Sequence, residues 1–367
     1  MSTSPPEEHS RTRPRTRTRT SPRSSKAGRS TWRAPRPPGR LHPRANLFGV
    51  PMGVAGLAQC WTAAAAADHV PQWPGLSLWV LTGMLWLVIS VAFVGNAARS
   101  HRWRSEVTDP TFGVFSSLGV LVPTLLALVL ALHSVAEWRV VFLVFVGLST
   151  GYGGWVTAGW VVNGGSLERW HPGYLLPTVA TGLVCAAGAG QLGYRTLAVA
   201  LFGYGLVCWF SLTSIIWLRL FTLPPMPPAL APTLAIELAP PVVAGNAWFT
   251  VTGGRVDAVV LVLGGYAALM AVVQLRLLAL YRRLSFAAGW WAFAFSYAAA
   301  VAFAIRCLTA TGAATGLVDV LLGVITLGIG ALTVRSLVAL HAGTLLPREL
   351  PAAAPGLPVG QSGQRTS

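Results

Sequence analysis

The cysteine and histidine side chains, which could do chemistry, lie far apart along this chain. Four cysteines lie far apart in apolar stretches and form no CxxC pair: Cys60, Cys185, Cys208 and Cys307. The seven histidines show no HExxH or comparable spacing of metal ligands. A metal centre or a catalytic site needs several ligands, acids or bases at close range. The pattern therefore predicts no metal, no cofactor and no enzyme activity.

Two charges inside long apolar stretches could act on an ion: Glu237 and Arg306. A charge buried among apolar residues is costly, and in a membrane protein it often marks an ion path. Glu237 could titrate, or it could cap or pair locally at the end of a helix. Arg306 could attract an anion at a pore mouth, or its long side chain could reach the membrane interface as a plain anchor. Both interpretations stay open for each residue.

The composition indicates that lipid surrounds most of the chain. Of the 367 residues, 53% are apolar and only 10% are charged, whereas a soluble domain carries about 25% charged residues. The mean hydropathy of +0.59 is too high for a single buried core inside a polar shell.

A helix needs about 20 mostly apolar residues to cross the hydrocarbon layer. Cutting the apolar runs at charged or Pro/Gly-rich clusters predicts an all-α polytopic membrane protein with ten transmembrane helices. Short connections make neighbours antiparallel, so the ten helices form five helical hairpins. The predicted spans are 46–66, 77–97, 112–132, 138–161, 174–192, 195–219, 233–252, 257–280, 287–309 and 317–341.

The positive charge is concentrated at the N-terminus. The net charge is +16, and residues 1–44 hold twelve of the 27 Lys and Arg residues. This segment has almost no apolar residues, which predicts a disordered basic tail. Arginines on that side of the spans place both termini in the cytoplasm, with the protein in the plasma (inner) membrane. We therefore expect a membrane domain at 45–342, a short cytoplasmic tail at 343–367, and no nucleic-acid partner.

Prolines mark alternate spans. Pro51, Pro123, Pro177 and Pro240 lie in the first, third, fifth and seventh predicted spans, and the even spans have none. Proline removes a backbone donor and bends a helix, so the freed carbonyls need a neighbouring helix or water. This favours odd helices that line a central pore and even helices outside that face lipid. The alternative is a set of tolerated kinks with no pathway.

Four segments resemble the tellurite-resistance/dicarboxylate transporter family. This family includes TehA-like channels, plant slow anion channels, and yeast malate and sulfite transporters. The order and spacing of the segments agree across residues 46–341. They are NLFGVPMGVAGLAQCW at 46–61, HPGYLLPTVATG at 171–182, APTLAIELAPPVVAGNAWF at 231–249 and WWAFAFSYAAA at 290–300.

The resemblance implies five hairpins around a pore, assembly as a homotrimer, and small inorganic or organic anions as ligands. In the family a phenylalanine on the ninth helix blocks the pore, within a pattern like WWAYTFP. Phe295 falls on that gate position, and Phe293 is the fallback. Here Ala294 and Ser296 replace the threonine and proline on either side of the gate, so the ninth helix should be less kinked.

Two functions remain in competition. The first is a gated anion channel or facilitator with an aromatic plug in each protomer. The second is a proton-coupled exporter of C4-dicarboxylates such as malate, of sulfite or of tellurite-related oxyanions. A membrane enzyme would need a cluster of carboxylates or histidines near the midplane, and the sequence offers none.

Overall fold

The computed structural model describes residues 44–100, 106–109, 111–133, 136–313 and 315–345. These residues belong to one compact unit, Arg40–Ser367. Within them every regular element is a helix, as the sequence predicts. The basic tail at 1–44 lies outside the described residues except for Arg44, and so does the C-terminal tail beyond residue 345.

In the described part of the chain, ten helices are long and apolar enough to cross a membrane. We number these spans one to ten along the chain. The even spans are single α-helices of 24 to 28 residues: α2 (Trp73–Ser100), α5 (Ala136–Asn163), α7 (Arg195–Thr222), α9 (Ala258–Tyr281) and α11 (Thr315–His341).

Each odd span begins with a short 3-10 helix and continues as an α-helix. Span five also contains a π-helical turn, η5 (Leu176–Ala180). The 3-10 segments are η1 (Ala45–Phe48), η2 (Gly113–Ser116), η4 (Pro172–Leu175), η6 (Ala231–Leu238) and η7 (Ala288–Trp290). The α-helices that follow them are α1 (Gly49–Ala65), α4 (Ser117–Leu132), α6 (Thr181–Gln191), α8 (Ala239–Thr252) and α10 (Trp291–Ala310).

Burial separates the two sets of spans. The most apolar stretch of spans one, three, five and seven is 67 to 83% buried, and that of span nine is 44% buried. The corresponding stretches of the even spans are only 11 to 28% buried. Large apolar side chains such as Val91, Leu275 and Leu327 are more than 60% exposed on the even helices. Such surfaces are stable in lipid and not in water.

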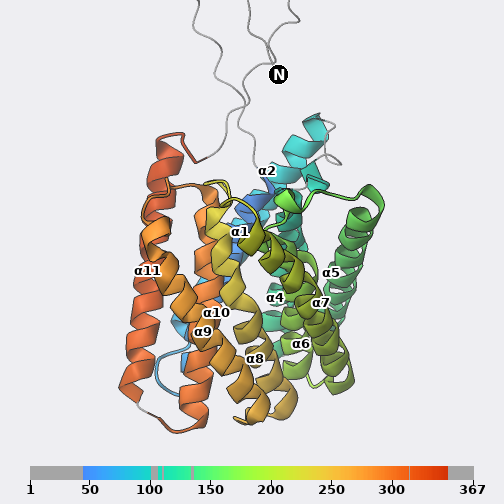
Figure 1. Cartoon of the computed structure of the whole chain (residues 1–367). Coiled ribbons are helices and arrows are strands. Elements are labelled where there is room, and N and C mark those ends of the chain that lie inside the picture. The colour runs from blue at the N-terminus through green and yellow to red at the C-terminus, as the bar shows by residue number, and fades with distance from the viewer. Residues whose placement is uncertain (1–43, 101–105, 110, 134–135, 314, 346–367) are drawn as a thin grey trace, which may run out of the picture. The chain divides into compact units, whose positions relative to one another are not determined.

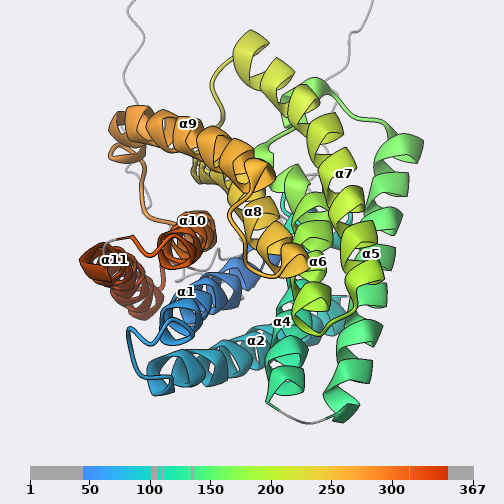
Figure 2. The same ribbon diagram turned by 90° about the horizontal axis from the view of Figure 1, so that it is seen from below.

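The α-helices of the odd spans contact one another in a closed ring. Helix α1 contacts α4, α4 contacts α6, α6 contacts α8, α8 contacts α10, and α10 returns to α1. Each even helix packs against the odd helix that precedes it in sequence. Figures 1 and 2 show α1, α4, α6, α8 and α10 in the interior and the even helices around them. We call the end of the ring where Ala45 lies proximal and the opposite end distal.

The closest approach in this ring is between α1 and α10. A Cβ atom built at Gly53 would lie 2.7 Å from the Ala294 Cβ, and one at Gly56 would lie 2.9 Å from the Ala298 Cβ. Only glycine allows the two backbones to approach so closely. The Cys60 thiol also donates a hydrogen bond to the Ala298 carbonyl at 3.1 Å. These contacts fix the position of α10 against α1.

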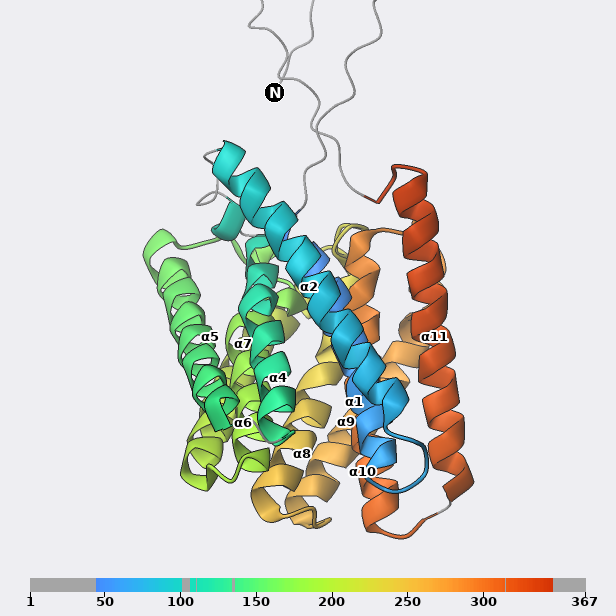
Figure 3. The same cartoon turned by 180° about the vertical axis from the view of Figure 1, so that it is seen from behind.

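Helix α2 ties two inner helices together from outside. The Trp86 indole donates a hydrogen bond to the Gly119 carbonyl in α4 at 2.8 Å. The Trp79 indole donates to the Thr62 hydroxyl in α1 at 3.3 Å. Figure 3 shows α2 leaning across α1 beside α4. An outer helix thereby helps to hold the inner ring in register.

Candidate functional site

Two cavities lie inside the ring and share part of their walls. All five odd spans contribute to the more proximal cavity, through residues such as Met52, Phe115, Leu176, Ile236 and Phe295. Spans five, seven and nine line the second cavity. Leu176, Ile236 and Phe295 belong to both linings. Phe295 therefore lies where the two spaces meet.

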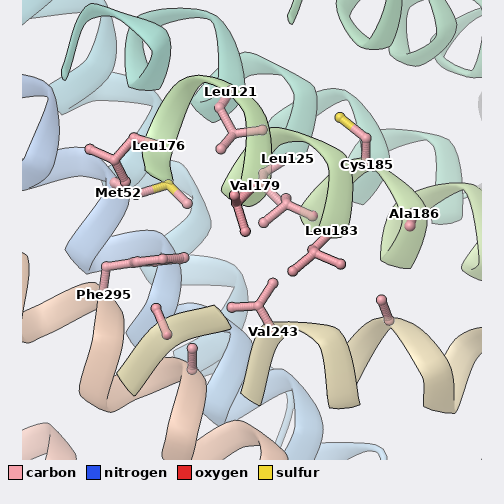
Figure 4. Packing of buried hydrophobic residues seen from close by; sticks show 14 of the residues in the cluster. Met52, Leu121, Leu125, Leu176, Val179, Leu183, Cys185, Ala186, Val243 and Phe295 are labelled. Atoms are coloured by element: carbon pink, nitrogen blue, oxygen red, sulfur yellow. The ribbon is translucent and has the colours of Figure 1, made fainter. Parts of the chain in front are cut away.

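The surroundings of Phe295 are apolar. Its side chain is 7% exposed and projects toward the space between Met52, Leu176, Val179 and Val243 (Figure 4). Leu121, Leu125 and Leu183 are further apolar side chains of this region (Figure 4). An ion placed among these side chains would lose its hydration shell without gaining polar ligands.

Helix α10 is fixed on two sides of Phe295. On one side Ala294 and Ala298 meet the glycines of α1. On the other side the Asn246 amide in α8 donates a hydrogen bond to the Ala299 carbonyl at 3.2 Å. The backbone around Phe295 is thereby held between α1 and α8.

Phe293, the fallback from the sequence, lies in another environment. Its ring packs against Tyr281 at 4.7 Å, Trp290 at 5.5 Å and Tyr297 at 5.7 Å between centroids. Phe293 lines neither of the two cavities described above. The aromatic cluster around it connects α10 to the end of α9.

The four prolines of the sequence prediction occupy two kinds of position. Pro123 lies inside the regular helix α4. Pro177 and Pro240 each lie at the second position of a new helical segment, and Pro51 is the third residue of α1. A proline in the first turn of a helix removes no required hydrogen bond, because the first N–H groups have no partner within the helix. Three of the four prolines thus accompany a change of helix type.

Glu237 is buried at 7% exposure but faces an outer helix. The Trp217 indole in α7 donates a hydrogen bond to Glu237 Oε2 at 3.0 Å. Glu237 Oε1 is buried without a hydrogen-bond partner among the described residues. Its neighbour Ile236 lines both cavities, whereas Glu237 lines neither. The carboxylate therefore lies between the inner ring and α7.

Arg306 lies in the distal half of α10, four residues before its end. Its side chain is half-buried, and Nε is buried without a hydrogen-bond partner among the described residues. It lines neither of the two cavities, which lie nearer the proximal end. The structure thus places the two charges of the sequence prediction in different inner spans, and neither residue lines the cavities beside Phe295.

His171 is a positioning residue that the sequence reasoning did not single out. It is fully buried, and its Nε2 lies 3.0 Å from the Thr111 carbonyl. Because Nδ1 accepts the Gly173 N–H at 3.2 Å, the proton of the neutral ring is on Nε2 and is donated to Thr111. The ring also stacks on Phe115, a residue of the proximal cavity wall. Burial lowers the pKa of His171 to about 4, so the neutral form holds the start of span five.

The signal for His171 was present in the sequence. The imidazole directly precedes Pro172, at the first residue of the HPGYLLPTVATG segment. A polar residue followed by proline is a common start of a helix. Its partner Thr111 is 60 residues away in sequence, so only the structure identifies the contact.

Comparisons of the sequence with known proteins identify its relatives. The profile of the SLAC1 family, described as voltage-dependent anion channels, matches residues 42–345. The tellurite resistance protein TehA homolog of Haemophilus influenzae is 25% identical over 263 residues, which cover 69% of this chain and 77% of that protein. The S-type anion channel SLAH3 of Arabidopsis thaliana is 25% identical over 284 residues, or 72% of this chain.

The match to SLAH3 covers 43% of that longer protein. The family profile, in contrast, spans nearly the whole described part of this chain, including every odd and even span. The resemblance expected from the four sequence segments is confirmed, and so is a multi-pass membrane protein whose function is anion transport. The chain belongs to the SLAC1 family of voltage-dependent anion channels.

Proposed function

We propose that the protein is a gated anion channel or facilitator whose pathway follows the axis of the odd-span ring. The observation that carries this proposal is the position of Phe295 in the walls of both interior cavities. In this proposal the five pairs of consecutive helices are hairpins. Their first helices line the pathway and their second helices face lipid.

Phe295 acts as the plug. Its ring separates the two cavities, and the side chains around it are apolar, so the closed constriction stops ions by dehydration. Rotation of the ring toward one cavity would join the two spaces. Because the constriction contains no charged side chain, an anion would be held only weakly there, as fast passage requires.

The proposed orientation has both termini in the cytoplasm of a cell whose plasma (inner) membrane holds the protein. The described arginines at the proximal end include Arg99, Arg169, Arg282 and Arg283, and cytoplasmic ends of spans are enriched in such residues. The proximal cavity would then face the cytoplasm. Assembly as a homotrimer, with one pathway in each protomer, is proposed from the family resemblance.

Replacing Phe295 with alanine tests the plug. The variant F295A should raise the anion current in planar bilayers about tenfold or more, which corresponds to lowering the barrier by about 1.4 kcal/mol. The matched control is F293A, which removes the same ring from the same helix outside both cavities. F293A should leave the current close to that of the unmodified protein. An unchanged current in F295A, with protein present in the membrane at normal levels, would show that Phe295 is not the plug.

A proton-coupled exporter of C4-dicarboxylates, sulfite or tellurite-related oxyanions is the second candidate. The specific observation in its favour is the buried Glu237, whose Oε1 has no partner among the described residues. A carboxylate in such a place can exchange a proton during transport. The reversal potential separates the candidates: in a channel it follows the anion gradient alone, whereas in a coupled carrier it also shifts with the pH gradient.

A further inference from the structure

The distal half of α10 presents a charge along the same line as the plug. Arg306 follows Phe295 by eleven residues. At about 100° per residue this is three full turns plus about 20°, so the two residues project from nearly the same side of the helix. The rise of about 1.5 Å per residue places Arg306 about 16 Å distal to Phe295 along the helix axis.

Contacts on either side show which way this line of α10 faces. Ala298 lies about 60° to one side of Phe295 and meets Gly56 of α1. Phe303 lies about 80° to the other side and packs on Gly245 and Phe249 of α8. Phe295 and Arg306 project between these two contacts. This direction is the interior of the ring, since the cavities beside Phe295 lie there.

Among the described residues, none holds the guanidinium of Arg306 in place by a hydrogen bond. No hydrogen bond or ion pair to its guanidinium is found within the described part of the chain, and Nε is buried without a partner. Two other arginines of the molecule lie over aromatic rings. Arg44 lies over the Phe112 ring, and Arg335 lies over the rings of Phe286 and Trp290. An inward-facing guanidinium without a partner is free to bind an anion.

The inner helices next to α10 also become polar distal to the plug. Gln59 follows Met52 in α1 by seven residues, which returns it to within about 20° of that cavity-lining residue. Asn246 follows the cavity-lining Val243 in α8 by three residues, and its Oδ1 has no partner among the described residues. Polar groups in this part of the ring can replace part of the hydration shell of an ion.

We propose that Arg306 forms an anion-recognition site distal to the plug and that it selects planar monovalent oxyanions, such as nitrate or a carboxylate, over chloride. A guanidinium offers parallel N–H donors in a rigid fork that matches two oxygens of an oxyanion, whereas a spherical halide uses the charge alone. This inference rests on the proposed function, because the site lies on the same axis as the plug.

The test compares three variants of the full chain in planar bilayers with nitrate on one side and chloride on the other. R306Q removes the charge and the fork, and R306K keeps the charge but removes the fork. R255Q is the matched control, because Arg255 is an exposed arginine three residues beyond the distal end of α8. R306Q and R306K should each lower the nitrate-to-chloride permeability ratio about tenfold, the size expected for lost hydrogen bonds to a charged group. R306K should retain chloride current, and R255Q should keep the original ratio.

An unchanged permeability ratio in R306Q would overturn the site. An unchanged ratio in R306K would overturn the role of the fork, because charge alone would then account for selection.

A binding measurement keeps this inference separate from the channel function. Nitrate should raise the melting temperature of the detergent-solubilised protein relative to gluconate at equal ionic strength, and R306Q should lose that increase. R306Q could lose the nitrate-dependent increase in melting temperature while neither the unmodified protein nor F295A conducts anions. That result would support the anion site and contradict the proposed channel function. Equal increases in both proteins would overturn the site.

Discussion

The odd and even spans differ in backbone conformation as well as in burial. The odd spans begin with 3-10 turns, span five includes a π-helical turn, four of the five contain the prolines described above, and the most apolar stretch of each odd span is more buried than that of any even span. The even spans are uninterrupted α-helices with large apolar side chains exposed. In lipid an unpaired backbone group has no water to bind, so irregular backbone is tolerated only where protein or a cavity surrounds it. Departure from the α-helix is therefore itself an indicator of which spans are inside.

The strongest way to break this comparison is to place a proline in an even span. Leu269 lies in the middle of α9 and is 54% exposed. L269P should destabilise the protein by about 3 kcal/mol or more, because the freed carbonyl would face lipid. Melting temperature and yield in detergent measure this effect, with L269A as the control for the lost side chain. If L269P melts like L269A, exposed helices tolerate proline as well as the inner helix that holds Pro123.

A side chain added at a glycine should have opposite outcomes in the two sets of spans. At Gly56 a Cβ would meet the Ala298 Cβ at 2.9 Å, whereas at Gly151 in α5 no atom lies within 4 Å. G56L should cost about 1–3 kcal/mol of stability through overpacking, and G151L should cost little. Thermal unfolding of the two variants measures the difference. Equal melting temperatures would show that α1 and α10 can separate without penalty.

Acid should loosen an odd span before an even one. Span five begins directly after buried His171, whose pKa of about 4 lies below its ordinary value of 6.5. The unfolded chain therefore binds this proton first, so the stabilisation is complete above about pH 6.5 and declines as the pH falls toward 4. At pH 5.5 the loss is about 1 kcal/mol. The even helix α9 is capped instead by Asp257, whose pKa is lowered by hydrogen bonds, first from the Trp248 indole and then from the Val260 N–H.

The control for this effect is H171Q, which keeps a neutral donor near Thr111. Melting temperatures between pH 7 and 5 should fall more steeply for the unmodified protein than for H171Q. If the melting temperatures of the two proteins fall in parallel with pH, His171 does not cause the acid sensitivity and other groups do.

Sequence reasoning located the ten spans to within a few residues, because the length of an apolar run is a local property. For example, the second span was predicted at 77–97 and the helix is Trp73–Ser100. The 3-10 and π-helical turns were not predicted, since helix type there depends on packing between distant segments. The resemblance proposed both Phe295 and Phe293 as the gate. The structure places Phe295 at the cavities because the direction of a side chain is decided by the neighbours of α10, which the sequence does not show.

The same limit applies to the two charges. Glu237 and Arg306 were grouped as possible ion-path residues because each interrupts an apolar run. In the structure Glu237 bonds to Trp217 of α7, whereas Arg306 follows the helical line of Phe295. Helical phase alone would have related Arg306 to Phe295. No sequence pattern indicates that Ile236, and not Glu237, faces the cavities.

The contact of α1 with α10 has a consequence for biogenesis. Cys60 donates a hydrogen bond to the Ala298 carbonyl although 238 positions separate the two residues in sequence. A ribosome must therefore synthesise nearly the entire membrane domain before the glycine surface of the first helix meets its partner. Until then that surface is covered only by lipid or by insertion factors. Nascent chains that stop before the ninth span cannot close the ring of inner helices. We expect quality-control proteases to degrade such incomplete chains.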